Sequence, residues 1–315
     1  LSTIAIPNSL TAGTLTAVVS ASTTVSDWAV DAIEVDTTGA TLTGAHAAPV
    51  SLTTAAMTTV ANGVDAATDE VTVSTALDQA SLTVGTALSA TVNVTAAATI
   101  TTLAVGAIDT TINVSDDVTI TTLTASGDVV IAGTGDVTIT NATAVASIDA
   151  SGLTGTLTVD ASAANVAITT GDDSDITLST ATVVADITGG AGDDVIDATA
   201  LTSGTLAADL GAGNDTVNFG DVLSGIVAMV GGTGTDTVNL YDGVVYSGAG
   251  TWAVSGFEAL TFTDAAAAAV VAQAATVSGA QAESFTSLAI TGPSTGTSDD
   301  TAVLTVTATA AGTTD

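Results

Sequence analysis

Residues 91–103 read TVNVTAAATITTL, and residues 111–123 read TINVSDDVTITTL. The two segments are related by an offset of 20, and in both the apolar side chains alternate with small polar ones. EVTVS at 70–74 matches the start of the same unit, and VTIT at 118–121 recurs at 137–140. Alternation with a period of two is typical of β-strands with one buried face, so the chain repeats a β-rich unit of about 20 residues.

Glycines mark turns at nearly the same interval farther along the chain. They are Gly133, Gly152, Gly171, Gly190, Gly211 and Gly232. Each repeat then holds two short strands and two turns, which leaves no room for a crossover helix. This pattern predicts an all-β fold, a right-handed parallel β-solenoid over residues 70–245.

The flanking regions lack this ladder of glycines. Residues 1–69 and 246–315 are expected to form smaller β-rich regions or caps, and the alanine-rich stretch from Ala265 to Ala275 is a candidate helix. A β-sandwich is the alternative interpretation of the alternation, because its turns also recur about every 8–12 residues.

The charge of the chain excludes several functions. It contains no lysine or arginine and 33 acidic residues, which gives a formal net charge of −33 at pH 7. Without cations it cannot neutralise phosphates, so we expect no nucleic-acid partner. Hydrophobic residues make up 46% of the chain, which favours a folded protein over a disordered one. No apolar run approaches the ~20 residues of a membrane-spanning helix, and the lack of cysteine excludes disulfides and thiolate metal sites.

Three of the glycine turns carry a more specific pattern. Residues 189–197 (GGAGDDVID) and 231–239 (GGTGTDTVN) follow G-G-x-G-x-D-x-U-x at every position, where U is apolar. Residues 210–218 (LGAGNDTVN) lack only the first glycine. Glycines permit a tight turn whose carbonyls share one cavity with the aspartate of the sixth position. Such hard oxygen ligands, supplied by adjacent coils, are the ones that Ca²⁺ prefers.

We therefore expect Ca²⁺ to be held between coils by carboxylates and by glycine carbonyls beside them. The expected carboxylates are Asp194, Asp215 and Asp236, and Asp173 in the degenerate turn at 170–175 is expected to extend their column by one rung. The expected glycines are Gly190, Gly192, Gly211, Gly213, Gly232 and Gly234. The alternative is ordinary glycine and aspartate turns without metal, in which stacked carboxylates would repel without a counter-charge.

The nonapeptides resemble the calcium-binding repeat of RTX proteins. Their setting is similar to RTX-bearing bacterial S-layer proteins, in SIDASGLTGTLTVDASA at 147–163, ITGGAGDDVIDATAL at 187–201 and VSGFEALTFTDAAAA at 254–268. Each nonapeptide is followed by about 12 other residues instead of a second nonapeptide, so metal is expected along one edge only. The resemblance implies an extracellular, cell-surface protein that is exported by type I secretion and polymerises with calcium.

Together these features favour a non-enzymatic structural subunit of an S-layer, sheath or surface filament. Its expected partners are further copies of itself, calcium and cell-surface polysaccharide. The alternative is an RTX adhesin module that contacts glycans or surfaces through calcium. An enzyme is disfavoured because no basic residue besides His46 could move a proton or hold an anionic substrate, and because the aspartates lie in repetitive turns.

Overall fold

The computed structural model describes the central part of the chain almost continuously and the flanking parts in short segments. The described residues are 2–4, 14–19, 23–25, 32–37, 41–43, 50–54, 59–61, 70–75, 78–79, 82–84, 89–107, 109–163, 165–180, 183–220, 226–241, 245–246, 254–263, 274–275 and 285–291. The chain divides into two compact units, Leu1–Ala163 and Ala164–Asp315. His46 lies outside the described residues.

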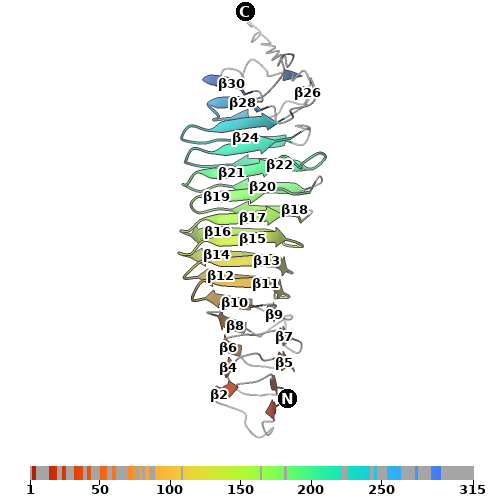
Figure 1. Ribbon diagram of the computed structural model, residues 1–315, viewed down its shortest axis with the longest axis vertical. Helices are drawn as coiled ribbons and strands as arrows, with labels where there is room; N and C mark the ends of the chain where they lie inside the picture. Colours follow the sequence, from red (N-terminus) through yellow and green to blue (C-terminus); the bar gives the residue numbers. More distant parts are fainter. Residues whose placement is uncertain are drawn as a thin grey trace, which may run out of the picture. The chain divides into compact units, whose positions relative to one another are not determined.

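The first unit is a parallel β-solenoid in which the chain passes alternately through two sheets (Figure 1). One sheet contains β2 (Thr14–Val19), β4 (Ala32–Thr37), β6 (Val50–Thr54), β8 (Glu70–Thr75), β10 (Ser89–Val94), β12 (Asp109–Val114), β14 (Asp128–Gly133) and β16 (Ser147–Leu153). The other contains β5 (Thr41–Thr43), β7 (Thr59–Ala61), β9 (Leu82–Val84), β11 (Ala98–Val105), β13 (Val118–Ala125), β15 (Val137–Ala142) and β17 (Leu157–Ala161). β1 (Ser2–Ile4) and β3 (Thr23–Val25) form a separate parallel pair.

Alternation along each strand builds the core of this unit. β12 and β13 bury every second residue over most of their length, and identical or similar apolar side chains then stack coil on coil. Ile100 pairs with Ile120, and Leu103 pairs with Leu123, all four fully buried. Burying one such side chain contributes roughly 1.5–3 kcal/mol, so a repeated coil supplies a repeated share of stability.

The register of the strands confirms two of the repeats and corrects a third. Thr91 pairs with Thr111, and Val118 pairs with Val137, as the offsets of 20 and 19 predict. The match of EVTVS at 70–74 with residues 91–95 is wrong by two residues, because Glu70 pairs with Ser89. A shift of two leaves the same side chains facing the core, so alternation alone does not distinguish the two registers.

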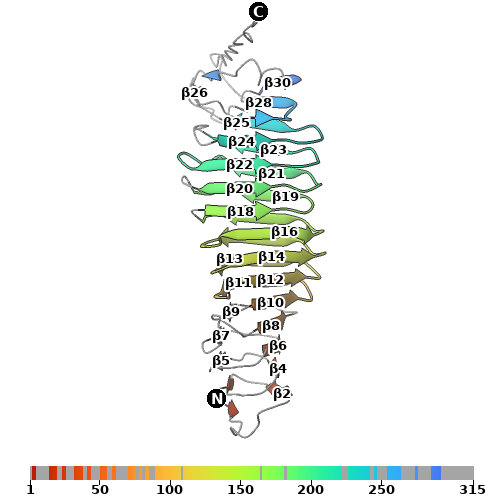
Figure 2. The ribbon, with the colours of Figure 1, turned by 180° about the vertical axis from the view of Figure 1, so that it is seen from behind.

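The second unit repeats this construction, and Figure 2 shows its strands from behind. One sheet contains β18 (Asn165–Thr169), β20 (Val184–Thr188), β22 (Thr205–Asp209), β24 (Ile226–Val230) and β27 (Val254–Ser255). The other contains β19 (Ser174–Thr177), β21 (Asp194–Ala198), β23 (Thr216–Phe219), β25 (Thr237–Tyr241), β28 (Ala259–Thr263) and β30 (Ser287–Thr291). β26 (Val245–Tyr246) and β29 (Ala274–Ala275) form a separate parallel pair.

Parallel pairing continues across both boundaries that were expected to end the solenoid. In the first unit β6 pairs with β8 on either side of residue 69, and in the second unit β25 pairs with β28 on either side of residue 245. Of the candidate helix from Ala265 to Ala275, only the last two residues are described, and they belong to strand β29. The described segments include no helix with the length and apolar character needed to cross a membrane.

Candidate metal centre

The solenoid places the sixth position of each nonapeptide at the start of a strand. Val195 pairs with Thr216, and Thr216 pairs with Thr237, so the preceding residues Asp194, Asp215 and Asp236 fall at one level of three successive coils. All three side chains are buried, with 1% of Asp194 and none of Asp215 or Asp236 exposed. The apolar eighth positions Ile196, Val217 and Val238 are fully buried in the core, as the motif predicts.

These carboxylates form a column in which each coil bonds to the next. The N–H of Asp194 donates to Oδ1 of Asp215 over 2.8 Å, and the N–H of Asp215 donates to Oδ1 of Asp236 over 2.9 Å. Charge-assisted hydrogen bonds of this kind fix the orientation of a carboxylate. We call Asp194, Asp215 and Asp236 the inner column; it is a buried, hydrogen-bonded row of acidic groups.

Two side chains outside the motif continue the inner column. Ser174 pairs with Asp194 in register, and its Oγ donates to Oδ1 of Asp194 over 2.5 Å. On the other side, the N–H of Asp236 donates to Oε2 of Glu258 over 2.8 Å. The rung before the column is therefore a neutral hydroxyl, and the rung after it is a fourth carboxyl group.

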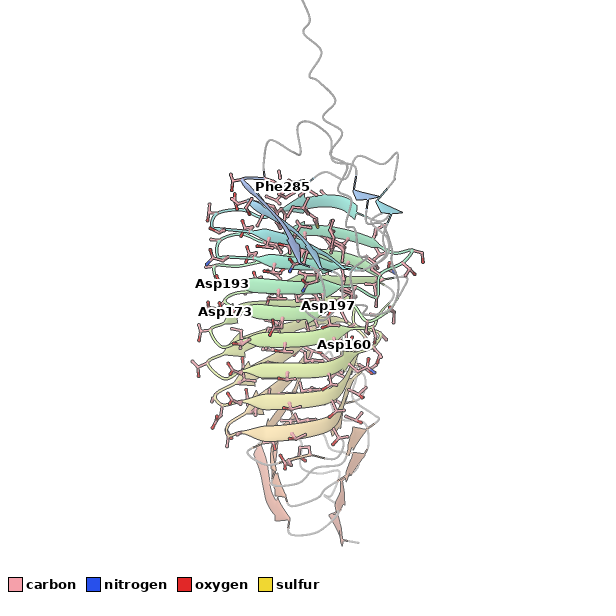
Figure 3. The ribbon with its side chains drawn as sticks, turned by 45° about the horizontal axis from the view of Figure 1, so that its top comes forward. Asp160, Asp173, Asp193, Asp197 and Phe285 are labelled. Atoms are coloured by element: carbon pink, nitrogen blue, oxygen red, sulfur yellow. The ribbon has the colours of Figure 1, made fainter. Side chains whose placement is uncertain are left out.

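The fifth position of the motif forms a separate, exposed ladder with the opposite direction of bonding. Oδ1 of Asp173 accepts from the N–H of Asp193 over 2.8 Å, and Oδ1 of Asp193 accepts from the N–H of Asn214 over 2.6 Å. Figure 3 shows Asp173 and Asp193 one above the other at the same edge of the coils. Asp173 thus belongs to this exposed ladder, and Ser174 occupies the rung of the inner column that was expected for Asp173.

The inner column contains buried oxygens whose hydrogen-bonding capacity is unused. Within the described part of the chain, Oδ2 of Asp215 and Oδ2 of Asp236 are buried and have no hydrogen-bond partner. Oδ2 of Asp194 has two long contacts, 3.4 Å from the N–H of Gly190 and 3.5 Å from Oγ1 of Thr170. A buried carboxylate oxygen without a partner is costly, by roughly 1–3 kcal/mol or more, which points to a bound proton or cation.

Main-chain carbonyls lie beside two of these oxygens. A Cβ on Gly231 would lie 2.2 Å from the carbonyl oxygen of Gly256 and 2.7 Å from Oδ2 of Asp236. A Cβ on Gly189 would lie 2.1 Å from the carbonyl oxygen of Leu210 and 2.6 Å from Oδ2 of Asp194. In these two motifs the first glycine therefore leaves open a space that borders both the carboxylate oxygen and a carbonyl oxygen of the next coil.

Burial raises the pKa of all three carboxyl groups in the inner column. Loss of hydration is the largest cause at each of them. At Asp215 burial outweighs the hydrogen bond from Asp194, repulsion from Asp194 and Asp236 adds to it, and the pKa rises to about 7. At Asp236 the charge of Glu258 raises the pKa further. Such groups hold a proton or attract a cation more readily than an exposed aspartate.

The predicted glycines build the turns, and two of their carbonyls accept hydrogen bonds from the next coil. The carbonyl of Gly190 accepts from the N–H of Ala212 over 3.0 Å, and the carbonyl of Gly211 accepts from the N–H of Thr233 over 2.9 Å. These bonds join one coil to the next. The other predicted glycines, Gly192, Gly213, Gly232 and Gly234, lie in the same turns, and positive φ angles are found at Gly211, Gly213, Gly232 and Gly234.

Four residues of the site escaped the sequence analysis: Ser174, Leu210, Gly256 and Glu258. Glu258 follows Asp236 at a spacing of 22, close to the spacing of 21 that joins the three motif aspartates, and this spacing could have identified it. The carbonyls of Leu210 and Gly256 carry no side-chain signal, because any residue supplies a main-chain oxygen.

Carboxylate oxygens such as those of the inner column are the kind of ligand that hard divalent cations prefer. Among the residues that the structure describes, no group of three or more acidic, histidine or cysteine side chains forms a metal cluster. A cation at this position would therefore combine carboxylate oxygens with main-chain carbonyls. Ca²⁺ binds 6–8 oxygens of both kinds, and it can keep water molecules among them.

Comparisons of the chain with protein families, with curated proteins and with solved structures find no match. The resemblance to RTX-bearing surface proteins rests on the motifs in the sequence.

Proposed function

We propose that this chain is a structural subunit of a self-assembling extracellular layer or filament, folded and stiffened by Ca²⁺ bound between its coils. One observation carries the proposal: the inner column buries three carboxylates, and Oδ2 of Asp215 and of Asp236 lacks a partner. The chain contains no lysine or arginine that could neutralise them. Bound calcium would supply this positive charge and link oxygens of successive coils.

The residues that would hold the ions are the carboxylates of Asp194, Asp215 and Asp236 and the carbonyls of Leu210 and Gly256. The hydrogen bonds from the preceding coils hold these carboxylates in place before an ion arrives. A cation that joins two coils resists their separation, so each occupied site stiffens the stack. The glycine turns contribute shape and main-chain hydrogen bonds from coil to coil.

Open strand edges support the role in assembly. In the described residues, β2 and β5 of the first unit and β27 and β30 of the second are the terminal strands of the two large sheets. Unpaired N–H and C=O groups of a terminal strand can pair with a strand of another copy. Calcium is plentiful outside cells and scarce inside, so dependence on calcium would couple folding to export, by the type I route that the RTX resemblance implies.

The test is electron microscopy and circular dichroism of the purified chain with calcium and with excess chelator. We expect sheets or fibres with calcium, and dispersed particles with a loosened β structure after chelation. Unchanged particles and unchanged circular dichroism in chelator would refute the proposal. Calcium-dependent glycan binding by a chain that stays monomeric would identify the adhesin function, with cell-surface polysaccharide as its partner, and would also refute assembly.

A further inference from the structure

The coil after the last nonapeptide repeats the geometry of the inner column without repeating its sequence motif. Thr237 pairs with Ala259, which sets Glu258 at the level of Asp236. The N–H of Gly231 donates to the carbonyl of Ser255 over 2.9 Å, as the N–H of Leu210 donates to the carbonyl of Val230 over 2.9 Å one coil earlier. The segment 254–258 (VSGFE) therefore takes the place of a fourth nonapeptide turn.

The Glu258 side chain makes the same bond as the motif aspartates. Its Oε2 accepts from the N–H of Asp236 over 2.8 Å. The bond from the N–H of Asp194 to Oδ1 of Asp215 has the same length. Only two residues separate the end of β27 at Ser255 from Glu258, whereas five separate the end of β24 at Val230 from Asp236. The longer side chain of glutamate reaches from this shorter turn to the same amide.

The same turn also places a main-chain carbonyl near the buried oxygen, because a Cβ on Gly231 would lie 2.2 Å from the carbonyl oxygen of Gly256 and 2.7 Å from Oδ2 of Asp236. The carbonyl oxygen of Gly256 lies beside the unpartnered Oδ2 of Asp236, as the carbonyl oxygen of Leu210 lies beside Oδ2 of Asp194. Gly256 has a φ of 73°, in the left-handed region that Gly211 and Gly232 also occupy with 89° and 109°. The turn at 254–258 thus supplies a carboxylate and a carbonyl on one side of Asp236.

We infer that Glu258 is the fourth carboxylate of the column and a ligand of its last cation, shared with Asp236 and the carbonyl of Gly256. At the opposite end Ser174 closes the column with a neutral hydroxyl that satisfies Oδ1 of Asp194. The inference rests on the proposed calcium sites and assigns to them a residue that belongs to no nonapeptide. It also assigns a role to the VSGFE segment: it completes the last site that the nonapeptides begin.

The test is the substitution Glu258→Gln in the full chain, with CaCl₂ as the probe. Glutamine keeps an oxygen that can accept from the N–H of Asp236 and removes only the charge. Bound calcium per chain is measured by equilibrium dialysis, and the unfolding midpoint is measured with calcium and with chelator. Asp186→Asn is the matched control, because Asp186 is exposed on β20 and its loss changes the net charge equally.

We expect Glu258→Gln to bind one calcium fewer than the wild type, or to bind its last calcium at least tenfold more weakly. In chelator its midpoint should equal or exceed that of the wild type, and Asp186→Asn should bind calcium like the wild type. A merely structural Glu258 would give wild-type binding in Glu258→Gln while Asp215→Asn loses calcium, which would overturn this inference alone. A wild-type chain that binds no calcium would overturn the proposed function and the inference together.

Discussion

Asp215 is a fully buried carboxyl group with one satisfied oxygen and one without a partner. Burial and its acidic neighbours raise its pKa to about 7, from 3.8 for an ordinary aspartate. The native state therefore holds a proton on Asp215 more tightly than the unfolded chain does. The resulting stabilisation is fully present below about pH 3.8 and is lost as the pH rises through about 7.

This shift predicts how pH acts on the calcium-free protein. Between about pH 5 and pH 8 in chelator, the unfolding midpoint of the wild type should fall, because Asp215 must lose its proton in a buried site. In Asp215→Asn the fall should be shallower, and at pH 8 the free energy of unfolding should be higher than in the wild type by roughly 1–3 kcal/mol. Thermal unfolding followed by circular dichroism measures both quantities.

At pH 8, calcium should make the wild type more stable to unfolding than Asp215→Asn, the reverse of their order in chelator. The cation binds the ionised carboxylate, so it stabilises the wild type and opposes the fall with pH. Asparagine still accepts the hydrogen bond from Asp194 but brings no charge to the ion. If calcium raised the midpoint of Asp215→Asn as much as that of the wild type, Asp215 would not be a ligand.

The turn is the element on which the stacking of the second unit depends. Gly234 has a φ of 146°, and a Cβ placed on it would lie 1.6 Å from the carbonyl oxygen of Gly213 in the preceding coil. In the same way, a Cβ placed on Gly213 would lie 2.1 Å from the carbonyl oxygen of Gly192. Only glycine allows this approach, because a side chain would both clash with the backbone and strain it.

Gly234→Ala should therefore destabilise the protein by roughly 2–4 kcal/mol, with or without calcium, as measured by denaturant unfolding. Gly152→Ala is the matched control. A Cβ on Gly152 would lie 3.2 Å from the Cβ of Ala132 and farther from any main-chain atom, and no positive φ is found there. Its effect should stay within about 1 kcal/mol of the wild type. Equal effects of the two substitutions would contradict the account of the stacked turn.

Sequence spacing predicted the elements but not every coil length. The short period of the repeat and the alternation within it indicate the parallel solenoid, since no other element fits between the turns. A spacing of 21 aligned Asp194, Asp215 and Asp236 correctly. The coil before Asp194 has a spacing of only 20, so the longer spacing pointed to Asp173 although Ser174 occupies the rung. Glu258 was missed because it belongs to no nonapeptide and follows a shorter turn, although its spacing of 22 from Asp236 is close to that of the motif aspartates.

At the scale of the whole molecule, electrostatic repulsion opposes folding. The net charge of −33 has no basic side chain to balance it except His46. Exposed carboxylates are surrounded by water, and salt screens their mutual repulsion. The screening length falls from about 30 Å at 0.01 M salt to about 10 Å at 0.1 M. The buried carboxylates of the inner column are screened much less, so salt and calcium should act on different parts of this repulsion.

This difference predicts the response to three salts. In chelator, NaCl should raise the unfolding midpoint gradually between about 0.01 and 0.5 M, because it screens exposed charges. At a fixed concentration of about 0.1 M NaCl, about 1 mM CaCl₂ adds almost nothing to screening, yet it should raise the midpoint by several degrees. Each site contributes about 1.4 kcal/mol when free calcium is tenfold above its dissociation constant.

MgCl₂ at the same concentration is the control for divalent charge. Mg²⁺ demands an octahedron of oxygens at about 2.0–2.1 Å and gives up its water reluctantly, whereas Ca²⁺ accepts irregular sets at about 2.3–2.6 Å. The inner column offers fixed carboxylates and main-chain carbonyls, which suit the larger ion. Thermal unfolding should therefore show a clear rise with calcium and only a small one with magnesium. Equal shifts with both ions would mean that the buried column does not select calcium over magnesium.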